Sequence, residues 1–266
     1  MLSLQRFIQQ QMPRYFIQLS YNGTAYHGWQ VQENTPHTVQ QVINETLSKI
    51  LNEPIAVTGC GRTDTGVHAK DFYAHFDCSK EDLHLHQEKW LHKFNAVLPH
   101  DIAVFRIIPV HAEASSRFDA VSRTYEYILI QKKDPFMING AYYLFGDLDI
   151  EAMNKAAALM FGYSDFSCFS KSNTQTFTNN CRVSKAEWKQ AEEGKYIFTV
   201  TADRFLRNMV RAIVGTLLEV GTGKSTADDF RKVIESKDRS NAGFSVPACG
   251  LYLTKVEYPQ TLFQQD

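Results

Sequence analysis

Short alternating strand patterns, separated by single amphipathic helices, constrain the fold of this chain more than any other feature. The segment 15–21 alternates apolar residues and predicts a strand that ends at the turn dipeptide Asn22-Gly23. A helix is predicted over 39–51, with Thr38 as its N-cap and Pro54 beyond its end. Because strands and single helices follow one another in this way twice, we expect an α+β (or α/β) protein of two similar halves.

The expected elements divide the chain into an extension (1–12), an N-terminal half (13–113), a C-terminal half (114–258) and a tail (259–266). Strands are predicted over 15–21, 54–60, 72–76, 102–108 and 117–130, on either side of Glu192-Glu193-Gly194, and through Leu251 and Leu253. Helices are predicted over 39–51, 79–94, 149–161, 205–220 and 225–236. We expect the extension to be disordered, or translation to begin at Met12.

The composition favours a globular protein of the cytosol. A hydrophobic content of 44% in 266 residues is enough for a sizeable core. No apolar run approaches the roughly 18 to 20 residues that cross a bilayer, and no signal-peptide pattern opens the chain. The five cysteines are widely spaced without a Cys-x-x-Cys pair, which favours reduced thiols over a zinc or redox site.

The charge balance limits how the chain can bind a nucleic acid. Its formal net charge is -1 and its isoelectric point is about 6.8, so it lacks the basic excess that many nucleic-acid-binding domains carry. Any RNA binding must therefore come from a local patch.

The loop from Gly59 to His68 carries the strongest chemical signal in the sequence. Three glycines between positions 59 and 66 allow positive φ angles and a close approach to a ligand, and Arg62, Asp64 and His68 stand among them. One interpretation is a turn in which Asp64 only caps the following amides. The tripeptide Asp64-Thr65-Gly66 also suggests an aspartic protease, but that chemistry needs a second such carboxylate and the chain has no second Asp-Thr-Gly or Asp-Ser-Gly.

The string Gly61-Arg62-Thr63-Asp64-x-Gly66-Val67-His68 resembles the signature of the tRNA pseudouridine synthase A family. The similarity runs from about Tyr15 to Tyr258, and Thr65 departs from the alanine that is common in the family. Further motifs follow in the family's order: Tyr21-Asn22-Gly23, Tyr26-His27-Gly28-Trp29-Gln30, Asn95-Ala96-Val97-Leu98-Pro99, Arg117-Phe118, Arg123-x-Tyr125-x-Tyr127, Phe205-Leu206-Arg207-Asn208-Met209-Val210-Arg211, Asp238-Arg239 and Gly250-Leu251-Tyr252-Leu253.

The resemblance implies a pseudouridine synthase fold, with a mainly antiparallel sheet flanked by helices in each half and a catalytic cleft between the halves. It implies an isomerase that converts uridine to pseudouridine at positions 38, 39 and 40 in the anticodon stem-loop of tRNA. This reaction oxidises nothing and imports no group, so no cofactor, nucleotide or metal is expected. The family pattern further implies a cytoplasmic homodimer that binds tRNA. A non-catalytic RNA-binding module with the same fold is the alternative.

Three residues match catalytic positions of the family. Asp64 matches its catalytic carboxylate, the expected nucleophile. A carboxylate in a pocket without water needs a cation nearby, because desolvation disfavours the charged form, and Arg211 matches the family's partner for it. Tyr125 matches the family's active-site tyrosine, which the resemblance assigns to stacking on the target base and to proton transfer at C5.

Four further residues are candidates for substrate binding. At about 100° per residue, Arg204, Arg207 and Arg211 share one face of a helix, which is either a solvated basic surface or a phosphate-binding one. Arg62 and His68 flank Asp64 and are candidates for contacts to the flipped nucleotide or its phosphates. His68 is alternatively a buried histidine bonded to the backbone.

Two other patterns imitate functional sites. The segment 221–226, Gly-Thr-Gly-Lys-Ser-Thr, resembles the end of a P-loop but lacks its first glycine, so we interpret it as a helix stop followed by a Ser225-x-x-Asp228 capping box. His84, His86 and His92 suggest a metal site, but no further ligand completes it, and a solvated helix face explains them better.

Overall fold

The computed structural model describes residues 12–33, 35, 37–171 and 178–263, so the predictions for residues 1–11 lie outside the described part. The strands are β1 (Arg14–Tyr21), β2 (Thr58–Gly59), β3 (His68–Asp77), β4 (Ile102–Val110), β5 (Ser122–Ile130), β6 (Tyr142–Tyr143), β7 (Val183–Glu192), β8 (Lys195–Ala202) and β9 (Leu251–Glu257). The α-helices are α1 (Val39–Leu51), α2 (Gln87–Val97), α3 (Ile150–Ala158), α4 (Met209–Gly221) and α5 (Ala227–Ser236).

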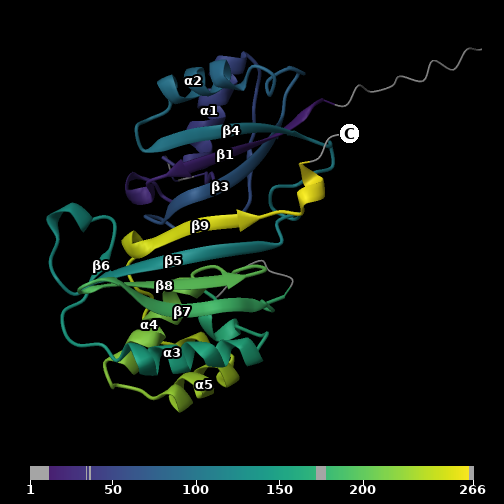
Figure 1. Cartoon of the computed structure of the whole chain (residues 1–266). Coiled ribbons are helices and arrows are strands. Elements are labelled where there is room, and N and C mark those ends of the chain that lie inside the picture. The colour runs from purple at the N-terminus through teal and green to yellow at the C-terminus, as the bar shows by residue number, and fades with distance from the viewer. Residues whose placement is uncertain (1–11, 34, 36, 172–177, 264–266) are drawn as a thin grey trace, which may run out of the picture.

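The strands form one mixed sheet with the order β4-β1-β3-β9-β5-β8-β7, with β2 beside β3 and β6 beside β5 (Figure 1). Most neighbours are antiparallel, and helices flank the sheet, so the expected α+β class and pseudouridine synthase fold are confirmed. The strands before residue 113 lie on one side of β9 and those after it on the other. The two halves therefore share a single sheet.

Strand β9, from the C-terminal end of the sequence, joins the two groups of strands. It pairs antiparallel with β5 from Ser122↔Glu257 to Tyr127↔Leu251. Its pairing with β3 is parallel and comprises His68↔Tyr252 and Ala69↔Leu253. The sheet is thus joined at its centre by a short ladder, immediately after the loop that carries Asp64.

Each group of strands has its own helical layer and core. The first core joins α1 and α2 to the sheet and includes Ile17, Ile43, Leu47, Phe72 and Phe94. The second joins α3, α4 and α5 to β5, β7 and β8 and includes Tyr127, Met153, Phe198, Ile213, Leu217 and Phe230. Tyr125 packs against both cores, which places its side chain where the two halves meet.

Several predicted elements are confirmed with their end signals. Helix α1 covers the predicted range, and the Thr38 side chain accepts a hydrogen bond from the Gln41 amide. Strands β7 and β8 flank Gly194, whose φ of +74° suits a tight turn. The predicted strand over 54–60 shortens to β2, because the amides of Ile55 and Val57 donate to side chains of α1 instead of to a neighbouring strand.

Two predicted elements begin later than expected. The helix predicted over 79–94 begins at Gln87, because residues before it form turns, one closed by the bond from the Leu85 amide to the Asp82 carbonyl. The strand predicted over 117–130 begins at Ser122. Residues 115–119 form a separate turn, in which the Ser115 amide donates to the Asp119 carboxylate.

The helix predicted over 205–220 begins at Met209, so the expectation that Arg204, Arg207 and Arg211 share one helix face is wrong. Asn208 has a φ of +67°, a left-handed conformation that interrupts the helix on its N-terminal side. Only Arg211 lies on α4, while Arg204 and Arg207 lie in the segment before it.

The segment that imitates a P-loop connects α4 and α5. Helix α4 ends at Gly221, and Gly223 has a φ of +73°, as a glycine stop requires. The capping box is one residue later than predicted. The side chains of Thr226 and Asp229 each accept a hydrogen bond from the other's amide, and Ser225 and Asp228 do not form the box. In the part of the chain that the structure describes, no helix is long and apolar enough to cross a membrane.

Gly215 on α4 provides a test of this packing. A β-carbon there would lie 1.8 Å from the Phe244 carbonyl oxygen, so Gly215→Ala must displace the backbone that follows Gly243. We expect a net loss of about 1–3 kcal/mol in the free energy of unfolding, measured by urea denaturation. Gly162→Ala is the control, since a β-carbon at Gly162 meets nothing within 4 Å. Equal stability of both variants would contradict the close approach.

Candidate active site

The loop with Asp64 lies between β2 and β3 and is held by the segment that follows β1. The Trp29 amide donates to the Thr63 carbonyl at 3.2 Å, and the Gly66 amide donates to the Tyr26 carbonyl at 3.3 Å. Within the loop, the Val67 amide donates to the Asp64 carbonyl at 3.1 Å. These bonds fix the backbone on both sides of the carboxylate.

Two glycines allow this segment and the loop to approach each other. A β-carbon at Gly28, whose φ is +87°, would lie 2.4 Å from the Thr63 carbonyl oxygen. One at Gly23 would lie 2.0 Å from the Val67 carbonyl oxygen. The glycines of the Tyr21-Asn22-Gly23 and Tyr26-His27-Gly28 motifs are therefore required by backbone contact, not by a ligand.

Side chains support the same loop from beneath. The Tyr21 and Thr63 hydroxyls share a hydrogen bond of 2.9 Å, and both residues are buried. The Trp29 ring packs 4.1 Å from that of Phe72 and lies against Gly59, where a β-carbon would clash with it. The sequence did not indicate this supporting role of Tyr21, because its alternation fits an ordinary strand residue.

Asp64 forms ion pairs with two arginines from the other half of the chain. The Arg211 Nη1 lies 3.4 Å from Oδ2, and the Arg207 Nε lies 3.8 Å from Oδ1. The side chains of Asp64 and Arg211 are 25% and 21% exposed, whereas that of Arg207 is 59% exposed. The arrangement places one half-buried guanidinium and one exposed guanidinium at the same carboxylate.

A further bond orients Arg211. Its Nε donates to the Val246 carbonyl at 2.7 Å, and the Val246 amide donates to the Arg211 carbonyl at 3.2 Å. The guanidinium is thereby held on two sides, by the loop after α5 and by Asp64. Such a fork of donors is a property of arginine that lysine lacks.

Tyr125 lies on β5 between the two cores, as described above. Its ring meets that of Phe205 edge to face, with centroids 5.0 Å apart. Burial raises the pKa of Tyr125 far above the usual value, and the charges of Cys60 and Asp64 raise it further. Among the described residues, none forms a hydrogen bond with the Tyr125 hydroxyl.

Arg62 and Arg204 lie in the same segments as the residues of the ion pairs, two residues before Asp64 and three before Arg207. Burial lowers the pKa of Arg117, and the charges of Arg62, Arg123 and Arg204 lower it further. Arg62 and Arg117 are exposed.

Arg123 connects the parts of the site, and the sequence analysis assigned it no role. Its guanidinium donates to the carbonyls of Cys60 at 3.0 Å, Arg117 at 2.6 Å, Ala120 at 3.0 Å and Asp203 at 2.8 Å. It therefore ties the base of the Asp64 loop to the turn before β5 and to the segment before α4. Its position two residues before Tyr125, on the same face of the strand, was the available signal.

His68 does not join this group. It is buried, its Nδ1 accepts a hydrogen bond from the Gly23 amide at 3.1 Å, and its Nε2 lies 3.1 Å from the Cys249 carbonyl. Burial lowers its pKa, so the neutral ring is favoured. With both ring nitrogens bonded to backbone, His68 matches the alternative of a structural histidine.

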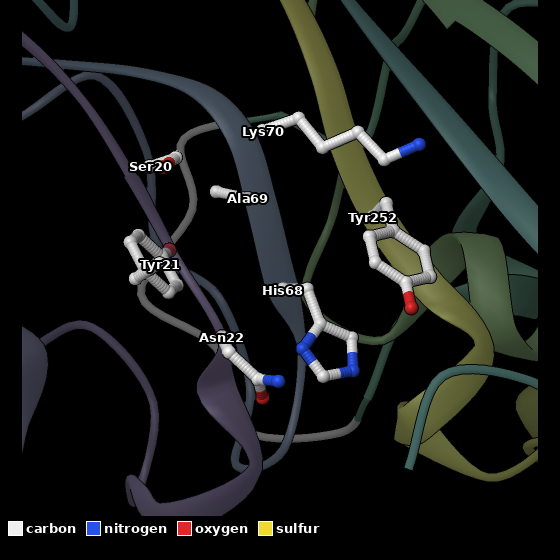
Figure 2. Close-up of a pocket in the computed structure, with 7 residues that line it drawn as sticks. All are labelled: Ser20, Tyr21, Asn22, His68, Ala69, Lys70 and Tyr252. Atoms are coloured by element: carbon white, nitrogen blue, oxygen red, sulfur yellow. The ribbon is translucent and has the colours of Figure 1, made fainter. Parts of the chain in front are cut away.

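A separate cavity of about 280 Å³ lies beside His68 (Figure 2). The His68 ring stacks on that of Tyr252 with centroids 4.6 Å apart, and the Lys70 ammonium lies 5.0 Å from the Tyr252 ring. The residues that line this cavity include neither Asp64 nor Arg211. Among the described residues, no group of three or more His, Cys, Asp or Glu side chains is arranged to hold a metal ion.

Comparison with known proteins gives the family. A tRNA pseudouridine synthase family model matches residues 156–259. The tRNA pseudouridine synthase A of Porphyromonas gingivalis is 52% identical over 253 residues, which cover 95% of this chain and 100% of that protein. The proteins of the same name from Parabacteroides distasonis and Bacteroides fragilis are 54% and 49% identical, over 95% and 94% of this chain and 98% of each of theirs. The resemblance is thus confirmed along almost the whole sequence, and the chain belongs to the tRNA pseudouridine synthase A family.

Proposed function

We propose that this chain converts uridine to pseudouridine at positions 38, 39 and 40 in the anticodon stem-loop of tRNA, with Asp64 as the nucleophile. The ion pair between Asp64 and Arg211 is the observation that carries the proposal, because it joins a carboxylate from one half to a guanidinium from the other. The names of the relatives support tRNA as the substrate. We further propose that the protein works in the cytoplasm without a cofactor.

The reaction needs one ionised carboxylate. The N1–C1′ bond of uridine breaks, the base turns, a C5–C1′ bond forms, and the proton at C5 is lost while N1 is protonated. Asp64 attacks C1′ and is released when the base rejoins the sugar. Removal of the 2′ proton by the same carboxylate is the alternative route.

Arg211 and Arg207 have different electrostatic roles in this proposal. Arg211 is held by Val246 and stabilises the charged form of Asp64 in a half-buried position. Arg207 is largely exposed and can turn toward a phosphate of the bound RNA. Arg62 and Arg204 extend the same cationic surface, which supports their assignment to substrate binding.

Tyr125 stacks on the extruded uracil in this proposal. Its raised pKa keeps the hydroxyl protonated near neutral pH, so the ring is uncharged beside Asp64. Proton transfer at C5 is the second role that the resemblance implied for Tyr125, and the raised pKa disfavours it, because a proton-transfer group acts best with a pKa near the operating pH. Extrusion of a base costs a few kcal/mol of stacking, which contact with an aromatic ring offsets.

We also propose a homodimer, which the family pattern implied. Phe136, Ile138 and Phe145 are 97%, 70% and 85% exposed on the segment 131–146, which stands out from the end of β5 on the left of Figure 1. Exposed apolar side chains in one short segment are typical of a protein–protein interface, and a second copy of the same chain is the commonest partner.

Replacing Asp64 tests the nucleophile. Asp64→Asn should reduce tritium release from tRNA labelled at C5 of uridine by at least roughly 10²–10⁴-fold, because the amide carries no negative charge. The dissociation constant for tRNA should stay within about threefold of the wild-type value. Asp228→Asn, an exposed carboxylate on α5, is the control. Substantial activity of Asp64→Asn would reject the proposed role, and a wild-type protein that binds tRNA without releasing tritium would favour the non-catalytic module.

Arg211 and Arg207 should differ in what they affect. Arg211→Ala and Arg211→Lys should lower the single-turnover rate by roughly 10²-fold or more with little change in affinity. Arg207→Ala should mainly weaken tRNA binding. The slope of the logarithm of the binding constant against the logarithm of the salt concentration should become shallower by about one, as expected for the loss of one phosphate contact. Circular dichroism would verify folding of each variant. If Arg211→Ala lost only affinity, Arg211 would be a phosphate contact.

The molecular mass in solution tests the proposed dimer interface. Light scattering should give the wild-type protein a molecular mass of twice 30.4 kDa. The double variant Phe136→Asp, Phe145→Asp should be monomeric, because an interface would have to bury two unpaired carboxylates. Phe161→Asp, an exposed phenylalanine at the end of the 3₁₀ helix after α3, is the control. A wild-type monomer, or a double variant that remains dimeric, would reject this interface.

A further inference from the structure

Phe118 is an exposed aromatic residue beside Arg117, and none of the roles above accounts for it. Its side chain is 80% exposed. It belongs to the turn of residues 115–119, before β5. An exposed phenylalanine that contacts neither core stabilises the folded chain little.

Hydrogen bonds fix the backbone of the turn that carries Phe118. The Phe118 amide donates to the Ser115 hydroxyl at 3.3 Å. The Ser115 amide donates to the Asp119 carboxylate at 2.7 Å, and the Asp119 amide returns a bond to the Ser115 carbonyl at 3.1 Å. Because these bonds fix the backbone of the turn, little backbone freedom is lost when a ligand binds against the ring.

The turn is also fixed next to the Asp64 loop. One nitrogen of Arg123, Nη2, donates both to the Cys60 carbonyl at 3.0 Å and to the Arg117 carbonyl at 2.6 Å. The residue before Phe118 and the base of the Asp64 loop therefore share a single donor atom. The turn that carries Phe118 is therefore a neighbour of the loop that carries Asp64.

The charge around Phe118 favours RNA over an apolar protein partner. The Arg117 guanidinium lies 5.4 Å from the centroid of the Phe118 ring. Arg123 bonds to the Arg117 carbonyl at 2.6 Å, so a second guanidinium lies beside the turn. An apolar partner would have to desolvate these charges, whereas a nucleotide offers a phosphate to the guanidinium and a base to the ring.

We propose that Arg117 and Phe118 form a binding site for one unpaired nucleotide next to the target uridine, with the base stacked on Phe118 and its phosphate on Arg117. This inference rests on the proposed function, since it adds a contact to the same RNA. Extrusion of the target leaves its neighbour without a stacking partner, and Phe118 replaces that partner. The site is thus a positioning site and not a part of the chemistry.

The test measures RNA binding in a variant in which turnover is removed. In the Asp64→Asn background, Phe118→Ala should raise the dissociation constant for unmodified tRNA, measured by filter binding, by roughly 5- to 150-fold. Phe118→Trp should restore it to within about threefold, whereas Phe118→Leu should not, because leucine is apolar but cannot stack as an aromatic ring. Phe161→Ala is the matched control and should bind as the parent does.

With Asp64 intact, Phe118→Ala should raise KM for tRNA by a similar factor while the single-turnover rate at saturating tRNA stays within about threefold. Affinity unchanged in Phe118→Ala, or restored equally by leucine and tryptophan, would overturn the proposal. A change in molecular mass without a change in RNA affinity would assign Phe118 to a protein interface and also overturn it. An inactive wild-type protein would reject the proposed function instead, because the binding measurements do not depend on turnover.

Discussion

The ion pair between Asp64 and Arg211 depends on contact between two parts of the chain that are distant in sequence. A half-buried carboxylate is costly unless a cation offsets the loss of water, and the cation here comes from α4. The pair forms because β9 lies between β3 and β5 and brings the two halves into one sheet. The close contact of Gly23 and Gly28 with the Asp64 loop, and the bond from Arg211 to Val246, then fix each partner from its own side.

The sequence predicted the elements well where local signals determine them. The cap at Thr38 and the turn at Gly194 lie where expected, because a side-chain acceptor and a positive φ are properties of single residues. Periodicity failed before α4, since it cannot detect that Asn208 adopts a left-handed conformation. Arg207 nevertheless lies near Asp64, although it approaches from outside the helix. The bonds of Arg123 could not be predicted, because its four acceptors are backbone carbonyls, and only its position on the same strand face as Tyr125 pointed to the site.

The residues of the site differ in how far they are exposed. Asp64, Arg211 and Tyr125 lie partly buried at the junction of the halves, and each is held or surrounded by protein. Arg62, Arg117 and Arg207 are exposed around them. In the proposed function, these exposed arginines give a chain of net charge -1 a local cationic surface for the RNA. In the proposed function, the partly buried residues act on the glycosidic bond and the exposed arginines contact the RNA backbone.

The parallel ladder between β3 and β9 affects the order in which the molecule can form. Of the strands in this sheet, β9 leaves the ribosome after all the others, and the sheet stays open at its centre until that strand arrives. Pairings between distant segments form slowly, since a long loop must close before any contact stabilises it. A nascent chain with both helical layers already packed would therefore still hold its acidic loop and its guanidinium apart, and competence for chemistry would appear only with the last strand.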